Sequence, residues 1–284
     1  MKIRIQCLST ACVDTVRYSG YNPSMLTILL LKISVSVLVV LGLSCLAEYA
    51  SPRLAGILAG FPTGSAITLF FIGLEQGPDF AADSAASNLT GLTAMLVFLY
   101  CYWKAPQKNN RAFAAPSALA LCGYFLCIIP LRMLPHSPIF SIILTICMIL
   151  LFRRLFSVIP DTTISQRQPL SARLLLLRSL CAASIILMVT ACAGTVGPRW
   201  SGLFSAFPST LFPLLLIVHA TYGYGPACSV IRHVPDGLGS LMVYSLTVSL
   251  TYGRQGICAG TLLAFAAATL YILGFMALFR RQRA

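Results

Sequence analysis

Residues 51–63 read SPRLAGILAGFPT, and the pattern returns at residues 197–209 as GPRWSGLFSAFPS. The offset is 146 residues without a gap, and the same offset pairs Lys32 with Arg178. Both copies lie in hydrophobic stretches long enough to cross a bilayer. Duplicated halves with Gly/Pro-interrupted apolar segments at matching places are typical of transport proteins whose site lies at the repeat interface. The duplication therefore predicts a membrane protein built from two related halves.

The composition fits a chain whose surroundings are mostly lipid. Of its 284 residues, 58% are hydrophobic and 10% charged, and the mean hydropathy is +0.86, which is too apolar for a soluble domain. Runs of bilayer length predict an all-α polytopic membrane protein with about nine transmembrane helices. Their expected limits are 26–48, 54–75, 84–103, 113–131, 137–156, 172–194, 200–221, 236–252 and 257–279.

The net charge of +13 follows the positive-inside pattern of a membrane protein rather than the footprint of a nucleic-acid binder. The cations gather in short loops and form no groove with interleaved aromatic residues. We therefore expect a bacterial inner-membrane protein, with its N-terminus outside, its C-terminus in the cytoplasm, and no nucleic-acid partner. The basic groups are Lys104, Lys108 and Arg111, then Arg153, Arg154, Arg167 and Arg173, then Arg280, Arg281 and Arg283, whereas Glu75, Asp79 and Asp83 form an acidic loop.

Residues 1–24 fit this orientation poorly. They carry Lys2, Arg4 and Arg17, would have to cross the membrane, and lack the apolar core of a signal peptide. We expect that translation starts at Met25, directly before the first span.

The two halves are predicted to be inverted relative to each other. The basic loop 104–111 and the basic linker 153–173 both belong in the cytoplasm, so two crossings separate them. Four-helix repeats at 25–134 and 171–284 are then five crossings apart, and an odd number inverts the second copy. Residues 135–170 supply the connecting fifth span and the linker.

The repeated motif predicts a helix that breaks halfway across the membrane. Pro52 and Pro198 suit the first turn of a helix, where the missing N–H costs nothing. Ten residues later, about 15 Å along a helix axis, Pro62 and Pro208 remove a backbone hydrogen bond and clash with the preceding turn. The freed carbonyls and neighbouring hydroxyls either bond to one another or coordinate a solute or ion. The expected solute-binding residues are Phe61, Pro62, Thr63, Ser65, Thr68, Phe207, Pro208, Ser209, Thr210 and Asp236.

Ionisable residues at the spans are costly in lipid and are therefore candidates for function. We expect boundary or structural roles for five of them, with Lys32 extending outward to water and Glu48 pairing with Arg53. Asp236 is expected at the start of a span, where the helix dipole would stabilise its negative charge or where it would line a polar cavity. The five boundary residues are Lys32, Glu48, Arg53, Arg178 and Arg199.

Enzyme signatures are missing from the sequence. It contains no HExxH, P-loop, GxSxG or paired-carboxylate motif, and its eleven cysteines have no metal-site spacing. We expect neither an enzyme nor a bound cofactor or metal, and an intramembrane enzyme is the least favoured function.

The repeated motif resembles that of the GlpM-like group of small bacterial inner-membrane proteins. Ala55-Gly56 with Phe61-Pro62-Thr63, and Ser201-Gly202 with Phe207-Pro208-Ser209, carry the resemblance. Members of that group are about half this length, so the resemblance implies a fused pair. It implies no catalytic residues, and an alginate-related role is attached to one branch of the group.

Two functions follow from these patterns. The favoured one is a secondary transporter or permease, embedded in the lipid bilayer, that moves a small solute at the interface of the repeats. The alternative is a non-transporting scaffold or accessory subunit of envelope polysaccharide assembly, in which the motif serves helix packing. Either function is compatible with a homo-oligomer.

Overall fold

The computed structural model describes residues 25–49, 56–58, 60–106, 109–135, 137–162 and 172–281. Regular structure in these residues is entirely helical, which confirms the expected all-α class for the described part of the chain. The chain divides into two compact units, and the described part of the first is residues 25–31. All contacts discussed below lie within the second unit, Lys32–Ala284.

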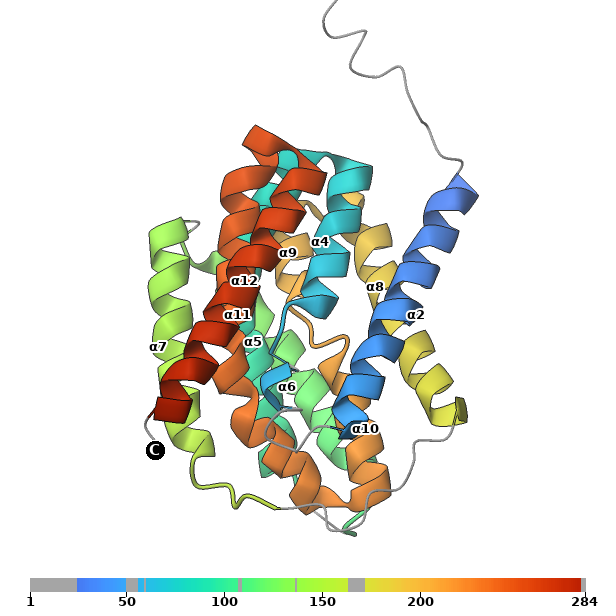
Figure 1. Ribbon diagram of the computed structural model, residues 1–284, viewed down its shortest axis with the longest axis vertical. Helices are drawn as coiled ribbons and strands as arrows, with labels where there is room; N and C mark the ends of the chain where they lie inside the picture. Colours follow the sequence, from blue (N-terminus) through green and yellow to red (C-terminus); the bar gives the residue numbers. More distant parts are fainter. Residues whose placement is uncertain are drawn as a thin grey trace, which may run out of the picture. The chain divides into compact units, whose positions relative to one another are not determined.

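The helices follow the predicted order, with a break in each copy of the motif (Figure 1). The first half contains α2 (Met25–Tyr49), a helical turn at 56–58, α4 (Thr63–Gln76), α5 (Pro78–Lys104) and α6 (Ala114–Met133). It is followed by α7 (Pro138–Phe156). The second half contains α8 (Ala172–Val196), α9 (Pro198–Ser205), α10 (Leu211–Tyr222), α11 (Tyr224–Gln255) and α12 (Ile257–Arg281).

Two glycines related by the 146-residue offset terminate α4 and α10. Gly77 has φ 94° and Gly223 has φ 93°, a left-handed conformation that glycine adopts without a steric penalty. Each is followed at once by the next helix. The expected starts of the third and eighth spans, at 84 and 236, were therefore too late, because α5 begins at Pro78 and α11 at Tyr224.

These glycines mark opposite ends of the helical bundle. At the Gly77 end, Gln76 lies against Gly194 near the end of α8. At the Gly223 end, the first residue of α11 donates its backbone N–H to the carbonyl of Asn110, at 2.9 Å. α4 runs toward the Gly77 end and α10 toward the Gly223 end, so the two helices have opposite directions (Figure 1).

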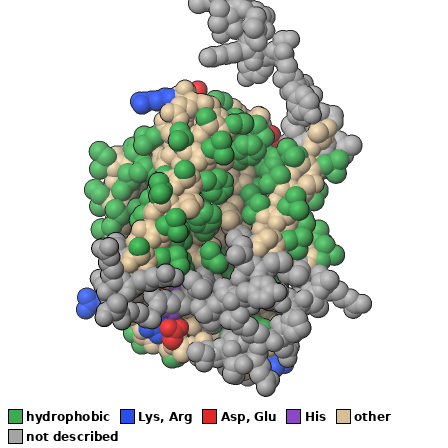
Figure 2. Space-filling view, in the orientation of Figure 1, with side chains coloured by type: hydrophobic (Ala, Val, Ile, Leu, Met, Phe, Trp, Pro, Cys, Tyr) green, Lys and Arg blue, Asp and Glu red, His purple; other side chains and the backbone are tan. Residues whose placement is uncertain are grey.

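Buried and exposed side chains divide the helices into a centre and a periphery. α5 and α11 carry most of the central core, for example Leu92 and Leu238, both fully buried. α6, α7 and α12 expose large apolar side chains, including Leu126, Ile139 and Leu262. In Figure 2 apolar side chains cover much of the visible face, a surface that water would not favour but lipid would.

Six described helical segments are long and apolar enough to cross a membrane. They support an integral membrane protein, and four of the predicted spans outside the broken motifs, at 84–103, 113–131, 137–156 and 257–279, lie largely within such segments. α11 is not among the six, so a count of nine crossings stays a prediction. The six are Gly56–Gln76, Pro78–Lys104, Ala114–Met133, Pro138–Phe156, Ser179–Val196 and Ile257–Ala277.

Candidate functional site

The two copies of the motif adopt the same broken backbone. In the second copy, Phe207 N bonds to Phe204 O at 3.0 Å and Ser209 N to Phe207 O at 2.6 Å. The first copy repeats these bonds 146 residues earlier, from Phe61 N to Leu58 O at 3.0 Å and from Thr63 N to Phe61 O at 2.7 Å. The prediction that the helix breaks at Phe-Pro is therefore confirmed in both copies.

Small residues let each broken segment approach a long helix of the other half. A Cβ atom added to Gly56 would lie 2.6 Å from Val230 O and 2.8 Å from His233 Cβ in α11. The equivalent contact, 146 residues away on each side, is that of Gly202, which packs in the same way against Ser84 and Ser87 of α5. The same exchange relates a second pair of contacts, in which Gly237 packs against Ile57 and Gly60, and Gly91 against Leu203 and Ala206.

The two breaks meet where α4 and α10 begin. Thr63 Oγ1 lies 3.4 Å from Thr210 Oγ1, and a Cβ on Gly64 would lie 2.3 Å from Ser209 Oγ. Ser209 Oγ is buried and has no hydrogen-bond partner among the described residues. A small cavity at this point, with room for about one water molecule, is lined by Phe61, Gly64, Ser65, Met95, Ala206, Phe207, Pro208, Ser209, Thr210, Leu211 and Leu241. Pro62 and Thr68 are buried close by in the chain, and the Thr68 hydroxyl donates to Gly64 O within α4.

Hydroxyl groups donate hydrogen bonds to backbone carbonyls that lose their helical N–H donors at the second break. Ser65 Oγ donates to Ser205 O at 2.8 Å, and Tyr124 OH donates to Leu203 O at 2.6 Å. In an unbroken helix these carbonyls would accept the N–H groups of residues 209 and 207. The first of the two alternatives, in which hydroxyls and carbonyls satisfy one another, therefore holds for both of these carbonyls.

An amide side chain extends this polar centre from α5. Asn88 is fully buried, donates from Nδ2 to Ser205 Oγ at 2.7 Å, and accepts at Oδ1 from Ser245 Oγ at 2.8 Å. It thus joins α5 to α9 and α11 beside the second break. The sequence offered one signal for it, a lone amide in an apolar span.

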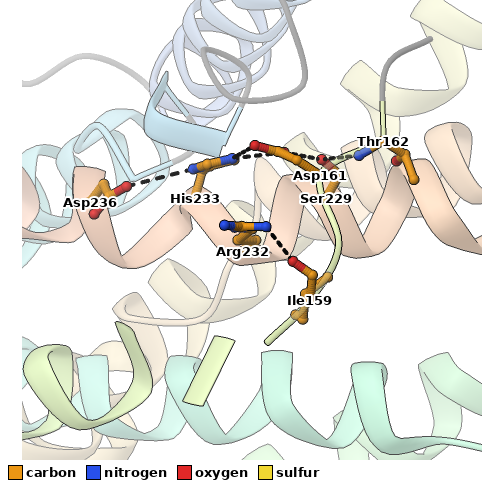
Figure 3. Close-up of polar contacts among 7 residues, drawn as sticks. All are labelled: Ile159, Asp161, Thr162, Ser229, Arg232, His233 and Asp236. Carbon is orange, nitrogen blue, oxygen red and sulfur yellow. Dashed lines mark hydrogen bonds and ion pairs between the residues drawn. The ribbon is translucent and has the colours of Figure 1, made fainter. Parts of the chain in front are cut away.

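A row of ionisable residues lies beside the first break (Figure 3). His233 Nε2 is 3.0 and 3.2 Å from the two carboxylate oxygens of Asp161, and Ser229 Oγ donates to Asp161 at 2.9 Å. On the other side, His233 Nδ1 is 3.6 Å from Asp236 Oδ2. Asp236 Oδ1 in turn pairs with Arg153 Nε of α7 at 3.0 Å.

This row corrects the placement of Asp236 and adds residues that the sequence did not single out. Asp236 lies twelve residues into α11 rather than in its first turn, so stabilisation of the helix dipole does not explain it. His233 shares its helix face, three residues earlier, and this spacing is the signal that the sequence offered. Asp161 comes from the loop after α7, and no local sequence pattern predicts that it contacts His233.

Asp161 stands at the exposed end of the row. Partial burial acts to raise the pKa of Asp161, but hydrogen bonds from His233 and Ser229 outweigh it, so that the pKa lies below its ordinary value. Half of its side chain is accessible, 53%, against 9% for His233. The row therefore leads from the solvent-exposed Asp161 to the nearly buried His233 and Asp236 of α11.

Lys32 is buried instead of reaching outward to water. Its side chain is 5% exposed and pairs with Glu75 Oε1 at 2.6 Å, while Nζ also donates to Thr190 Oγ1 at 2.7 Å. The expected outward extension was wrong because the end of α4 brings a carboxylate to the ammonium. The ion pair joins α2, α4 and α8.

Of the other boundary residues, Arg199 is half-buried and donates to Leu134 O. Arg53 lies outside the described residues, as do the side chains of Glu48 and Arg178, so the expected pair of Glu48 with Arg53 stays a prediction. His219 is fully buried, and its Nδ1 lies 2.9 Å from Tyr102 OH.

No family model, no curated protein and no solved structure matches this chain. The resemblance to the GlpM-like group therefore stays a prediction. The fold and the polar centre define an α-helical integral membrane protein with broken helices.

Proposed function

We propose that this chain is an inner-membrane secondary transporter for a small solute, built from two inverted four-helix repeats. The repeats are residues 25–134 and 171–284, and α7 is the unpaired helix between them. Nine crossings result if α11 and the broken α9–α10 segment also span the bilayer. The matched backbone bonds of the breaks, the exchanged glycine contacts and the opposite directions of α4 and α10 support this arrangement.

The observation that carries the proposal is the meeting of the two breaks around hydroxyl groups. Thr63 and Thr210 face each other at 3.4 Å, and Ser209 Oγ is left without a described partner. Broken helices of inverted repeats that meet near the midplane are the usual place of solute and ion sites in transporters. The cavity has room for about one water molecule, so this conformation is closed, and a solute enters when the segments around the breaks separate.

The Gly223 end faces the cytoplasm in this proposal. Lys104, Arg111, Arg153 and Arg154 belong to the loops or helix termini near that end, and Arg232, the ninth residue of α11, bonds to the loop carbonyl of Ile159, in line with the positive-inside bias. The C-terminus is then cytoplasmic and the N-terminus external.

A scaffold function is the second candidate, because the bonded carbonyls and close packing at the breaks suit a permanent helix interface. A scaffold needs no opening of the cavity, whereas a transporter does. If the two breaks were held together so that the cavity could not open, a scaffold would therefore keep its function and a transporter would lose it.

Transport is tested by reconstituting the full-length protein into liposomes with a panel of radiolabelled sugars, amino acids, organic acids and phosphate. We expect saturable uptake of at least one solute, reduced at least tenfold by Thr63→Val with Thr210→Val. The control, Thr247→Val, removes a hydroxyl that bonds within α11 and leaves uptake unchanged. Uptake of no solute by protein that is folded and inserted would contradict transport and favour the scaffold.

A further inference from the structure

The gap between His233 and Asp236 has the chemistry of an empty proton site. Both oxygens of Asp161 face Nε2, and a carboxylate accepts but does not donate, so Nε2 carries the hydrogen of the neutral ring. Nδ1 is then also an acceptor, and it faces the acceptor Oδ2 of Asp236 across 3.6 Å. This separation exceeds a hydrogen bond. One proton placed between the two atoms would convert a contact of two acceptors into a charge-assisted hydrogen bond.

The surroundings of this gap connect it with water at one end and with the first break at the other. Asp161 is 53% exposed, whereas the side chains of His233 and Asp236 are 9% and 12% exposed. Gly237, the next residue, packs against Ile57 O. A change in the position of Asp236 therefore acts directly on the segment that leads into the break.

We propose that His233 Nδ1 and Asp236 Oδ2 together bind one proton, and that this proton is the ion whose movement drives transport. The role of this proton as the driving ion rests on the proposed transport function, whereas its binding between His233 and Asp236 does not. Uptake adds one H⁺ to Nδ1 and leaves the Nε2–H bond to Asp161 in place, and release returns the same proton to water. No other covalent bond forms or breaks.

Proton uptake weakens the contact between α7 and α11. Asp236 faces Arg153 from α7 and Tyr271 from α12, and Arg232 of its own helix bonds to the loop carbonyl of Ile159. An imidazolium at His233 competes with Arg153 for the single negative charge of Asp236. α7 is then less firmly held, and the closed conformation opens more easily.

The first half lacks this site. The offset pairs His233 with Ser87 and Asp236 with Thr90, and Thr90 donates to Ser141 of α7 at 3.0 Å. Neither side chain titrates near neutral pH. We therefore infer one such site in each chain rather than two.

Trp103 provides a probe of α7 that needs no solute, because its ring centroid lies 6.0 Å from that of Phe156 at the end of α7. The chain has two tryptophans, so Trp200→Phe leaves Trp103 as the single reporter. In this variant we expect the fluorescence to change in a one-proton transition as the pH is lowered. Adding His233→Gln or Asp236→Asn removes the transition, Asp236→Glu retains it, and the control His219→Gln leaves it unchanged.

A transition that survives His233→Gln, or that is absent from the Trp200→Phe parent, would overturn the proton site. Folding is checked by size-exclusion chromatography, and Asp236→Asn, which preserves the side-chain shape, decides the question if His233→Gln does not fold. Because the fluorescence experiment uses H⁺ and no solute, its result is independent of the transport experiment. Solute flux without the transition removes the proton site, and the transition without flux of any solute removes the transporter.

Discussion

The α5 and α11 helices pack against equivalent broken segments but carry different chemistry on the packed face. In α5 the residues that face α9 and α7 are Ser87 and Thr90, whereas α11 places His233 and Asp236 at the equivalent positions. The backbone contacts are nearly the same on both sides. The difference indicates that close packing maintains both breaks, whereas ionisable side chains occupy these equivalent positions on α11 alone.

We expect the largest loss of stability when the close approach of the helices is removed. A Cβ at Gly202 would lie 2.1 Å from Ser84 O, and one at Gly237 would lie 2.1 Å from Ile57 O. Because backbone carbonyls obstruct both positions, we expect Gly202→Ala and Gly237→Ala to lower the free energy of unfolding by about 3 kcal/mol each. Thermal unfolding in detergent measures this loss. Gly274→Ala, which meets no atom within 4 Å, is the control, and equal stability of all three variants would refute the exchanged contacts.

A second asymmetry is the ion pair of Lys32, and Glu75→Gln tests it. The variant leaves a nearly buried ammonium with the Thr190 hydroxyl and the Phe71 ring as its neutral described partners, so we expect a loss of about 2 kcal/mol in unfolding free energy. Lys32→Met combined with Glu75→Gln should recover most of it, because no charge then remains unpaired. The offset equivalent of Glu75 is Thr221, and Thr221→Val should cost little. A double variant less stable than Glu75→Gln would contradict this account.

The carbonyls of the second break depend on hydroxyl donors, and Tyr124→Phe removes one of them. Leu203 O then loses the hydroxyl bonded at 2.6 Å, and a buried acceptor without its donor costs about 1–2 kcal/mol. Chemical denaturation measures the change. Leu126→Ala, at a side chain 69% exposed on the same helix, is the control. An unchanged midpoint for Tyr124→Phe would mean that this bond does not stabilise the break.

The smallest expected effect concerns pH at the exposed end of the row. The pKa of Asp161 is lower in the folded protein than the ordinary value of 3.8, so its contribution to stability is complete above that value and is lost as the pH falls through the lowered one. We expect the free energies of unfolding of wild-type protein and Asp161→Asn to differ above the ordinary value of 3.8 and to converge as the pH falls through the lowered pKa of Asp161. A difference that does not shrink below pH 3.8 would contradict the assigned hydrogen bonds.

The sequence predicts the backbone of this molecule better than the partners of its charges. Apolar run lengths and the repeated Phe-Pro step are local, so the helix order and the breaks at Phe61 and Phe207 could be read directly. The expected starts of α5 and α11 were late because residues 78–83 and 224–235, in which Pro and charged residues interrupt the apolar pattern, were assigned to loops. Lys32 was misplaced because helix packing brings Glu75 to its ammonium group, and Asp236 was misplaced because α11 begins twelve residues before it. Which carboxylate meets which cation depends on distances between elements far apart in sequence, and no local pattern records them.

The meeting of the two breaks is tested most directly by cysteines at Thr63, the first residue of α4, and at Thr210, the residue before α10. Thr63→Cys and Thr210→Cys are introduced together into a chain whose native cysteines are serine, with a protease site in the 163–171 linker. The hydroxyls are 3.4 Å apart, close enough for a disulfide once each becomes a thiol. We predict that mild oxidation of the folded protein in membranes keeps the two halves together after linker cleavage and that reduction separates them. Halves that separate without reduction, as in either single-cysteine control, would contradict the account.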